Sequence, residues 1–154
     1  MPKIASRITT QWQRFEDLSV PALYELLQFR QQIFVVEQRS AYPDLDGLDL
    51  NAQHLLLRSE GALTGYLRML LPSDTASAVR IGRVAIAAEM RGRALGRRLM
   101  TEALSFCAER HPGQPIALSA QLHLARFYRS FGFAEIGPPY DDLGVPHIDM
   151  VVPP

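Results

Sequence analysis

The sequence is poor in the residues and runs that would mark several classes of protein. Its 154 residues include one cysteine, Cys107, which excludes an intramolecular disulfide and a cysteine-rich zinc site. The four histidines are scattered and lack the spacing of metal ligands. No apolar run approaches the roughly 20 residues that span a bilayer, and the first residues lack the apolar core of a signal peptide. We therefore expect a soluble cytoplasmic domain that holds no metal and binds no membrane.

The chain also has no net charge. Sixteen basic residues balance sixteen acidic ones, and this neutrality argues against a nucleic-acid partner. The two signs are nevertheless separated along the chain. Six arginines lie between residues 80 and 98, and acidic side chains gather earlier, at Glu37, Asp44, Asp46 and Asp49. This segregation indicates either two solvated surface patches or a site that holds an anion on one side and a cation on the other.

The length and the hydrophobic pattern predict one α/β domain spanning residues 1–154 on a mixed sheet. Ser19 and Pro21 are typical of a helix start, and Gly132 of a helix end. We expect strands at 6–13, 53–59, 62–71, 78–87 and 115–120, helices after Ser19 and at 95–110 and 121–131, and two final strands in the tail.

Residues 90–100, MRGRALGRRLM, join an apolar strand to an amphipathic helix and combine four arginines with two glycines. The first N–H groups of a helix have no intrahelical partner, and the helix dipole is positive there. Glycine allows an anion to approach the backbone closely. The segment from Arg91 to Arg97 is therefore typical of a phosphate or pyrophosphate site, although it matches neither the Walker pattern nor the dinucleotide GxGxxG pattern. The alternative is a glycine-containing turn with solvated arginines.

A wider stretch of sequence carries a family resemblance. VAIAAEMRGRALGRRLMTEAL, followed about thirty residues later by FYRSFGF, resembles the GCN5-related N-acetyltransferase (GNAT) superfamily. The family turn [QR]-x-x-G-x-[GA] falls on Arg91, Ala94 and Gly96, with alanine in place of the first glycine. A left-handed backbone at Ala94 would be strained.

The second family signature, usually Asn…Tyr-x-x-x-Gly-Phe, falls on Gln121, Tyr128, Gly132 and Phe133, with glutamine in place of asparagine. FVVEQRSAYPDLDGLD and GVPHIDM are similar to the ElaA-type subgroup. The resemblance implies a mixed, mostly antiparallel sheet, flanked by helices, with a V-shaped splay between two central parallel strands.

The resemblance also implies where acetyl-CoA would bind. Its pantetheine arm would lie in the splay and pair with backbone groups of Val84, Ala85 and Ile86 as an extra strand would. Its pyrophosphate would lie on the turn, and Gln121 would be a further contact. The turn residues are Arg91, Gly92, Arg93, Ala94, Leu95, Gly96 and Arg97.

The implied reaction is direct transfer of an acetyl group to a primary amine in a ternary complex. It needs backbone N–H groups near Val84 to Ile86 for the oxyanion and an acid for the leaving thiolate, for which Tyr128 is the candidate. Glu37 leads as general base because FVVEQ borders the expected acceptor cleft. The other candidates are Asp46, Asp49, His54 and His147. DLDGLD is not a calcium loop, because Leu55 stands where the bidentate Glu is needed.

The sequence limits the class of acceptor but does not identify the molecule. The acceptor is a small-molecule or peptide amine, and the acidic loop 44–49 favours a cationic one. A CoA-binding sensor or scaffold that has lost catalysis is the alternative function. A homodimer through the exposed ends of the sheet is compatible with the sequence, which gives no direct sign of one.

Overall fold

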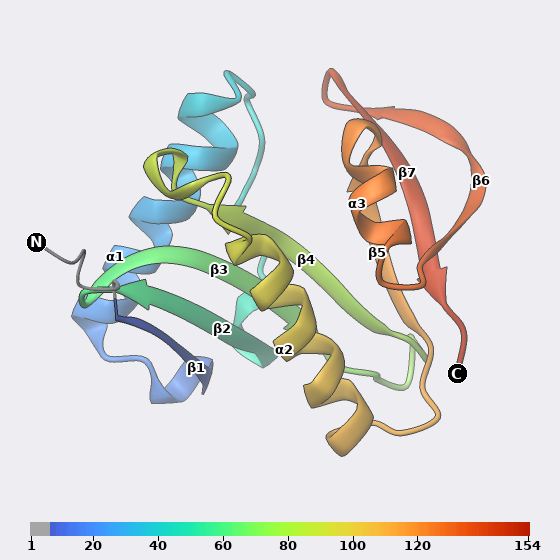
Figure 1. Ribbon diagram of the computed structural model, residues 1–154, viewed down its shortest axis with the longest axis horizontal. Helices are drawn as coiled ribbons and strands as arrows, with labels where there is room; N and C mark the ends of the chain where they lie inside the picture. The colour runs from blue at the N-terminus through green and yellow to red at the C-terminus, as the bar shows by residue number, and fades with distance from the viewer. Residues whose placement is uncertain (1–6) are drawn as a thin grey trace, which may run out of the picture.

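The computed structural model describes residues 7–154, which form one seven-stranded sheet with strand order β1-β2-β3-β4-β5-β7-β6 (Figure 1). The strands are β1 (Ile8–Arg14), β2 (Ala52–Ser59), β3 (Ala62–Leu70), β4 (Val79–Ile86), β5 (Ile116–Gln121), β6 (Ala134–Asp142) and β7 (Val145–Val152). β4 and β5 run parallel, and the other neighbouring pairs run antiparallel. The mixed α/β sheet is confirmed. The first residue of the strand expected at 6–13 lies outside the described residues.

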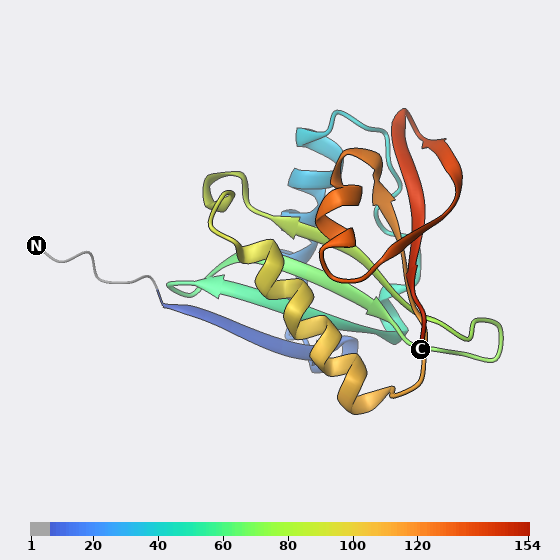
Figure 2. The same cartoon turned by 45° about the vertical axis from the view of Figure 1, so that its right-hand side comes forward.

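Two longer helices lie on opposite faces of the sheet. α1 (Val20–Gln31) begins where Ser19 Oγ accepts the N–H of Ala22 at 3.2 Å, and it continues into a π-helical stretch, η2 (Gln32–Glu37). α2 (Leu95–Arg110) crosses β3 and β4 on the other face, as Figure 2 shows. Its start and end match the prediction. Short 3-10 turns complete the chain: η1 (Phe15–Asp17), η3 (Asp49–Asn51), η4 (Ala88–Met90) and η5 (Leu122–Leu124).

The helix expected at 121–131 is shorter than predicted. Gln121 still belongs to β5, where it pairs with His147, and η5 follows before α3 (Ala125–Arg129) begins. No side chain caps α3, since the residue before it is Leu124. Gly132, at φ +95°, then turns the chain towards β6.

The main core lies between α2 and the sheet. Leu99 and Met100 of α2 have no exposed surface, and they pack in one cluster with strand residues such as Leu67 and Val79. Burial of one such leucine side chain contributes about 1.5–3 kcal/mol. A smaller cluster under α1 contains Leu26, Leu56 and Tyr66. Both faces of β3 are therefore covered, which holds the neighbouring strand β4 in place.

The sheet opens between its two parallel strands. β4 and β5 pair over Val79–Ile81 and Ile116–Leu118, and no further pairs join them. Beyond these residues β4 stays with β3, and β5 stays with β7. The predicted V-shaped splay is confirmed, and Figure 1 shows β4 and β5 diverging towards the end where η2 and α3 lie.

Two strands contain bulges. The first bulge is in β4. Gly82 of β4 pairs with Arg68 of β3, and Ala85 pairs with Tyr66, so two residues of β4 between these pairs face a single residue of β3. The first of the two, Arg83, has φ +54°. In β6, the segment 137–139 (Gly-Pro-Pro) opposes one residue of β7, and Figure 1 shows β6 bowing outward there. The first bulge lies in the splay and the second at the edge of the sheet.

Two features are absent from residues 7–154, the part of the chain that the structure describes. None of their helices is both long and apolar enough to cross a membrane. No group of three or more histidine, cysteine, aspartate or glutamate side chains among them is placed to hold a metal ion.

Candidate active site

Three adjoining cavities occupy the opening between β4 and β5. The turn cavity, about 260 Å³, lies at the start of α2. The helix-side cavity, about 570 Å³, lies between the end of β4, η2 and α3. The strand-side cavity, about 280 Å³, lies where β5, β6 and β7 face β4. Each cavity shares wall residues with the next: Ile86, Arg91, Gly96 and Phe127 join the first two, and Phe34, Gln38, Val84, Gln121, Leu124 and Tyr128 join the last two.

Most of the predicted site residues line these cavities. The helix-side cavity is lined by Glu37, Val84, Ala85, Ile86, Gln121 and Tyr128. The turn cavity is lined by Arg91, Gly92, Ala94, Leu95, Gly96 and Arg97. Arg93 is exposed and lines none of the three. Of the other candidate bases, His147 lines the strand-side cavity, whereas Asp46, Asp49 and His54 line none of the three.

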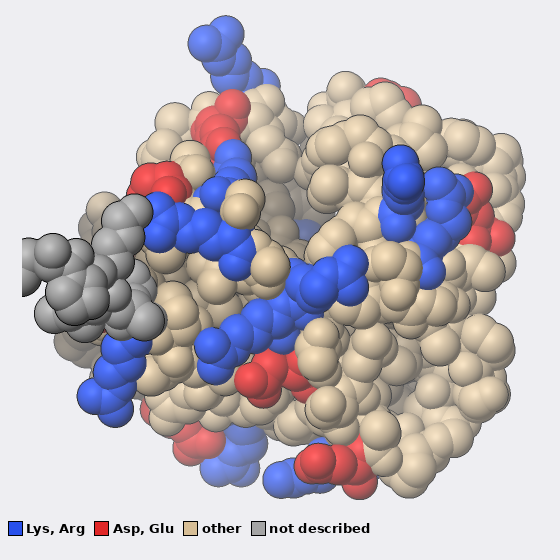
Figure 3. Space-filling model, viewed as in Figure 1, with Lys and Arg blue, Asp and Glu red and all other residues tan. Residues whose placement is uncertain are grey.

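The turn before α2 has the backbone shape of an anion site. Gly92 has φ +77° and Ala94 has φ +60°, so the left-handed conformation that is strained for an alanine is present. A Cβ on Gly96 would stand 3.6 Å from the ring of Phe127, at the wall that the turn and helix-side cavities share. Figure 3 shows basic side chains gathered over the start of α2, beside the hollow between the two halves of the sheet.

The open edge of β4 presents backbone groups to the helix-side cavity. Ala87 donates its N–H to the carbonyl of Thr64 at 2.8 Å, so the N–H and C=O of the preceding residue, Ile86, point away from β3. Since β5 has already diverged, these groups face the splay. They are available to an extended ligand, apart from the Ile86 carbonyl, which already accepts a hydrogen bond from Arg91 Nε at 3.0 Å.

Arg91 and Glu37 join the two walls of the helix-side cavity. Arg91 Nη2 donates to Glu37 Oε2 at 2.8 Å, and Nη1 donates to Oε1, so the pair is bidentate. These hydrogen bonds lower the pKa of Glu37 below its ordinary value. A carboxylate held in this way is a weaker base than the free side chain that the sequence suggested.

Tyr128 lies where the helix-side and strand-side cavities meet. It comes from α3, is 7% exposed, and packs edge-on against Phe127 and Phe133. Burial raises the pKa of its hydroxyl to about 12. The structure shows no hydrogen bond from this hydroxyl to another of the described residues, so the proton is free for a ligand.

The acidic stretch is neither a solvated patch nor a cation site. Its aspartates form a network with arginines from α1, β3 and β4, namely Arg30, Arg68 and Arg83 with Asp44, Asp46 and Asp49. Arg30 is fully buried and lies 2.9 Å from Asp44 and 2.7 Å from Asp49. Arg83, expected on the anion-binding side, instead lies 2.8 Å from Asp44. The acidic and basic side chains that are separated along the sequence therefore neutralise one another in the fold.

His54 is part of this buried network and not of the cleft. Its ring nitrogens contact Tyr66 Oη at 2.6 Å and the carbonyl of Asp49 at 2.9 Å. Burial lowers the pKa of His54 and raises that of Tyr66. The imidazole is therefore a neutral structural group.

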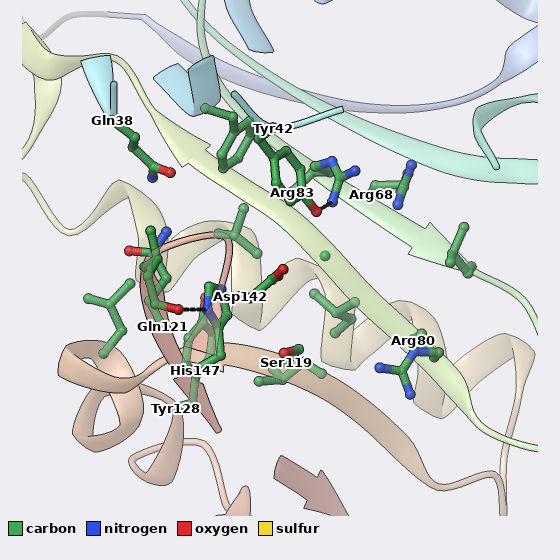
Figure 4. Close-up of a pocket in the computed structure, with 18 of the residues that line it drawn as sticks. Gln38, Tyr42, Arg68, Arg80, Arg83, Ser119, Gln121, Tyr128, Asp142 and His147 are labelled. Carbon is green, nitrogen blue, oxygen red and sulfur yellow. Dashed lines mark hydrogen bonds between the residues drawn. The ribbon is translucent and has the colours of Figure 1, made fainter. Parts of the chain in front are cut away.

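The polar wall of the strand-side cavity comes from strands distant in sequence (Figure 4). His147 of β7 places Nδ1 2.8 Å from the carbonyl of Val145, so Nδ1 donates its N–H to that carbonyl and Nε2 is left to face a ligand. Asp142 of β6 and Arg80 of β4 line the same cavity. Sequence reasoning missed Asp142, and noted Arg80 only as one of a group of arginines, because neither lies in a recognisable motif.

The splayed sheet and the turn at the start of α2 define a class of proteins, the GNAT acyltransferases. A family model described as an acetyltransferase (GNAT) domain matches residues 25–153, and the chain belongs to this family. The family uses CoA-linked acyl donors and amine acceptors.

Within the family, the chain is similar to ElaA. It is 42% identical over 144 residues to ElaA of Escherichia coli, covering 91% of this chain and 94% of that protein, and the ElaA crystal structure superimposes with a TM-score of 0.88. A crystal structure described as an acyl-CoA N-acyltransferase from Pseudomonas aeruginosa has 38% identity and a TM-score of 0.89, covering 94% of this chain and 99% of that one. A UPF0039 protein of Synechocystis is 40% identical over 150 residues, covering 96% of this chain and 97% of that protein.

Proposed function

We propose that the protein transfers an acetyl group from acetyl-CoA directly to a primary amine in a ternary complex. The observation that carries this proposal is the continuous row of three cavities, with Tyr128 between the two larger ones. A donor that enters from the turn and an acceptor that enters from the strand side would meet beside its hydroxyl. No covalent acyl-enzyme is then needed, because both reactants share one cleft.

The residues around the turn and helix-side cavities fit the donor. The free N–H groups at the start of α2 suit the pyrophosphate, and the open backbone edge at Val84 and Ile86 suits the amides of the pantetheine arm. Ala85 between them pairs with Tyr66, so its N–H and C=O turn towards β3 and only its side chain is left for the ligand. Arg91 lines both cavities. We infer that a bound pyrophosphate draws Arg91 away from Glu37, because both anions compete for the same guanidinium.

In the transfer step the amine nitrogen forms a bond to the thioester carbonyl carbon, and the carbon–sulfur bond breaks. Backbone N–H groups at the β4 bulge, near Val84, stabilise the oxyanion. The Tyr128 hydroxyl donates a hydrogen bond to the departing sulfur. His147 replaces Glu37 as our preferred base, since Nδ1 donates to Val145 and Nε2 can accept the amine proton in the strand-side cavity. Glu37 is left as the partner of Arg91.

Two measurements test the proposal. Acetyl-CoA is supplied with a library of amines, and release of the CoA thiol is followed. Binding of CoA is measured by calorimetry on the wild type and on Gly96→Val, whose new side chain would point towards Phe127 across the cavity wall. Ala108→Val, at an exposed position of the same helix, is the matched control for the helix-propensity cost.

We expect thiol release that depends on the amine, and CoA binding that Gly96→Val weakens at least 10-fold while Ala108→Val leaves it unchanged. No heat of binding at millimolar CoA would refute the donor assignment. CoA binding without thiol release for any amine would instead indicate the sensor or scaffold function.

A further inference from the structure

The strand-side cavity contains a cation that the fold does not neutralise. Three arginines line it, Arg68, Arg80 and Arg83. Arg68 binds Asp46 through two hydrogen bonds of 2.8 Å, and Arg83 lies 2.8 Å from Asp44. The Arg80 side chain forms no hydrogen bond or ion pair with any residue in 7–154, and it is exposed to the cavity and to solvent. Its guanidinium fork is therefore open to a planar anion such as a carboxylate.

The opposite wall contains a carboxylate side chain and an imidazole. Asp142 forms no side-chain hydrogen bond or ion pair with another described residue, and it is partly buried. His147 lies nearby on β7, with its Nδ1–H already used by Val145. Figure 4 shows Asp142 and His147 grouped above Tyr128, with Arg80 set apart beyond Ser119. The cavity thus has an anionic end near the transfer point and a cationic end away from it.

The register of the strands sets the separation of these ends. Arg80 pairs with Ala117 near the apex of the splay, and His147 pairs with Gln121, four residues further along β5. At about 3.3 Å per residue the offset along the strands is roughly 13 Å, and the two backbone positions also lie on opposite sides of β5, about 4.8 Å from it on each side. They are therefore roughly 16 Å apart, and their side chains reach into the space between. The volume of about 280 Å³ is near the lower end for small-molecule pockets, which suits a compact acceptor.

We propose that the acceptor is an amine that also carries a carboxylate, namely an amino acid or a short peptide with a free C-terminus. Its carboxylate binds Arg80, and its amine lies beside Asp142 and His147, facing the thioester at Tyr128. This inference rests on the proposed acetyl transfer. It replaces the purely cationic acceptor that the acidic loop suggested, because the arginine network already neutralises that loop.

The test uses acceptors in matched pairs that differ by the carboxylate. Lysine is compared with 1,5-diaminopentane, and glycylglycine with its C-terminal amide, so that the first pair represents amino acids and the second represents peptides. The ratio of kcat/KM within each pair, from thiol release, is measured on the wild type, Arg80→Gln and Arg110→Gln. Arg110, at the far end of α2, lines none of the three cavities and is the control.

We expect the carboxylate form of at least one pair to be favoured about 10- to 100-fold, the range for a charge-assisted hydrogen bond. Arg80→Gln should remove that preference through KM without changing CoA affinity, and Arg110→Gln should keep it. Equal kcat/KM within both pairs, or a preference that survives Arg80→Gln, would overturn the inference.

Failure of the acetyl transfer itself would look different. If no amine releases thiol, binding of the same four compounds to the CoA-loaded protein is measured by calorimetry. Tighter binding of the carboxylate forms that depends on Arg80 would support the carboxylate site independently of catalysis. Equal affinities would overturn it.

Discussion

Replacing Tyr128 by phenylalanine removes one hydroxyl from the junction of the two larger cavities and changes little else. The ring keeps its edge-on contacts with Phe127 and Phe133, at centroid distances of 5.1 and 6.3 Å. The hydroxyl forms no hydrogen bond with the described residues, so its loss leaves no buried partner unsatisfied. We expect the free energy of unfolding to change by less than about 0.5 kcal/mol.

The catalytic effect follows from the raised pKa of the hydroxyl. Burial holds the Tyr128 pKa at about 12, whereas an alkyl thiol has a pKa near 8.5. Full proton transfer to the departing thiolate is therefore uphill by roughly 5 kcal/mol, at 1.36 kcal/mol per pKa unit. We expect the hydroxyl to act as a hydrogen-bond donor to the charged sulfur, which is worth about 1.5–3 kcal/mol. Tyr128→Phe should then lower kcat about 10- to 150-fold.

The assay is thiol release at saturating acetyl-CoA and acceptor, with the melting temperature and the CoA dissociation constant measured on the same sample. Because the Tyr128 pKa is about 12, the wild-type rate should show no alkaline loss from this group below about pH 11. A folded Tyr128→Phe enzyme with the wild-type kcat would refute the role of the hydroxyl. A large fall in melting temperature would refute the claim that it has no structural partner.

Two further predictions concern the charged groups. The Glu37→Gln variant should bind CoA a few-fold more tightly, because Arg91 is released for the pyrophosphate. Its kcat should change less than 10-fold. A fall in kcat of about 10²–10⁴ would instead identify Glu37 as the general base. Stability should fall in acid. Partial burial alone would raise the pKa of Asp46, but hydrogen bonds from Arg68 and the Leu48 N–H lower it to about 2. Its contribution to stability, about 1 kcal/mol because solvent screens this exposed residue, is present above pH 4 and is lost as the pH falls through 2. Urea unfolding between pH 7 and 2 should show that Asp46→Asn lacks this part of the pH dependence, and identical pH profiles for the two proteins would contradict the assignment.

Local patterns predicted the turn and the helix that follows it. The apolar stripe of α2 repeats within one helix, and the family pattern, with glycine at the position of Ala94, drew attention to a left-handed backbone there. The order and spacing of two motifs then predicted the splay. The turn and the helix depend on residues close together in the chain, which is why the sequence was sufficient for them, whereas the splay was implied by the family resemblance that those motifs carry.

The charge network could not be predicted in the same way. Arg83 meets Asp44 across 39 residues, and it reaches that face of the sheet because the bulge adds one residue to β4. Nothing local in the sequence marks either event. The strand-side cavity is similar, since Arg80, Asp142 and His147 come from three strands whose adjacency depends on the whole sheet order.

The outward bow of β6 has a consequence for assembly. An edge strand with free N–H and C=O groups can template the addition of another chain, which leads to open-ended fibres or to strand-paired dimers. Here the middle of the edge is curved, and Pro138 and Pro139 have no N–H to donate. A second copy would find its hydrogen-bond ladder interrupted at the centre. A homodimer formed by strand pairing at an end of the sheet would therefore need the β1 edge at the opposite end.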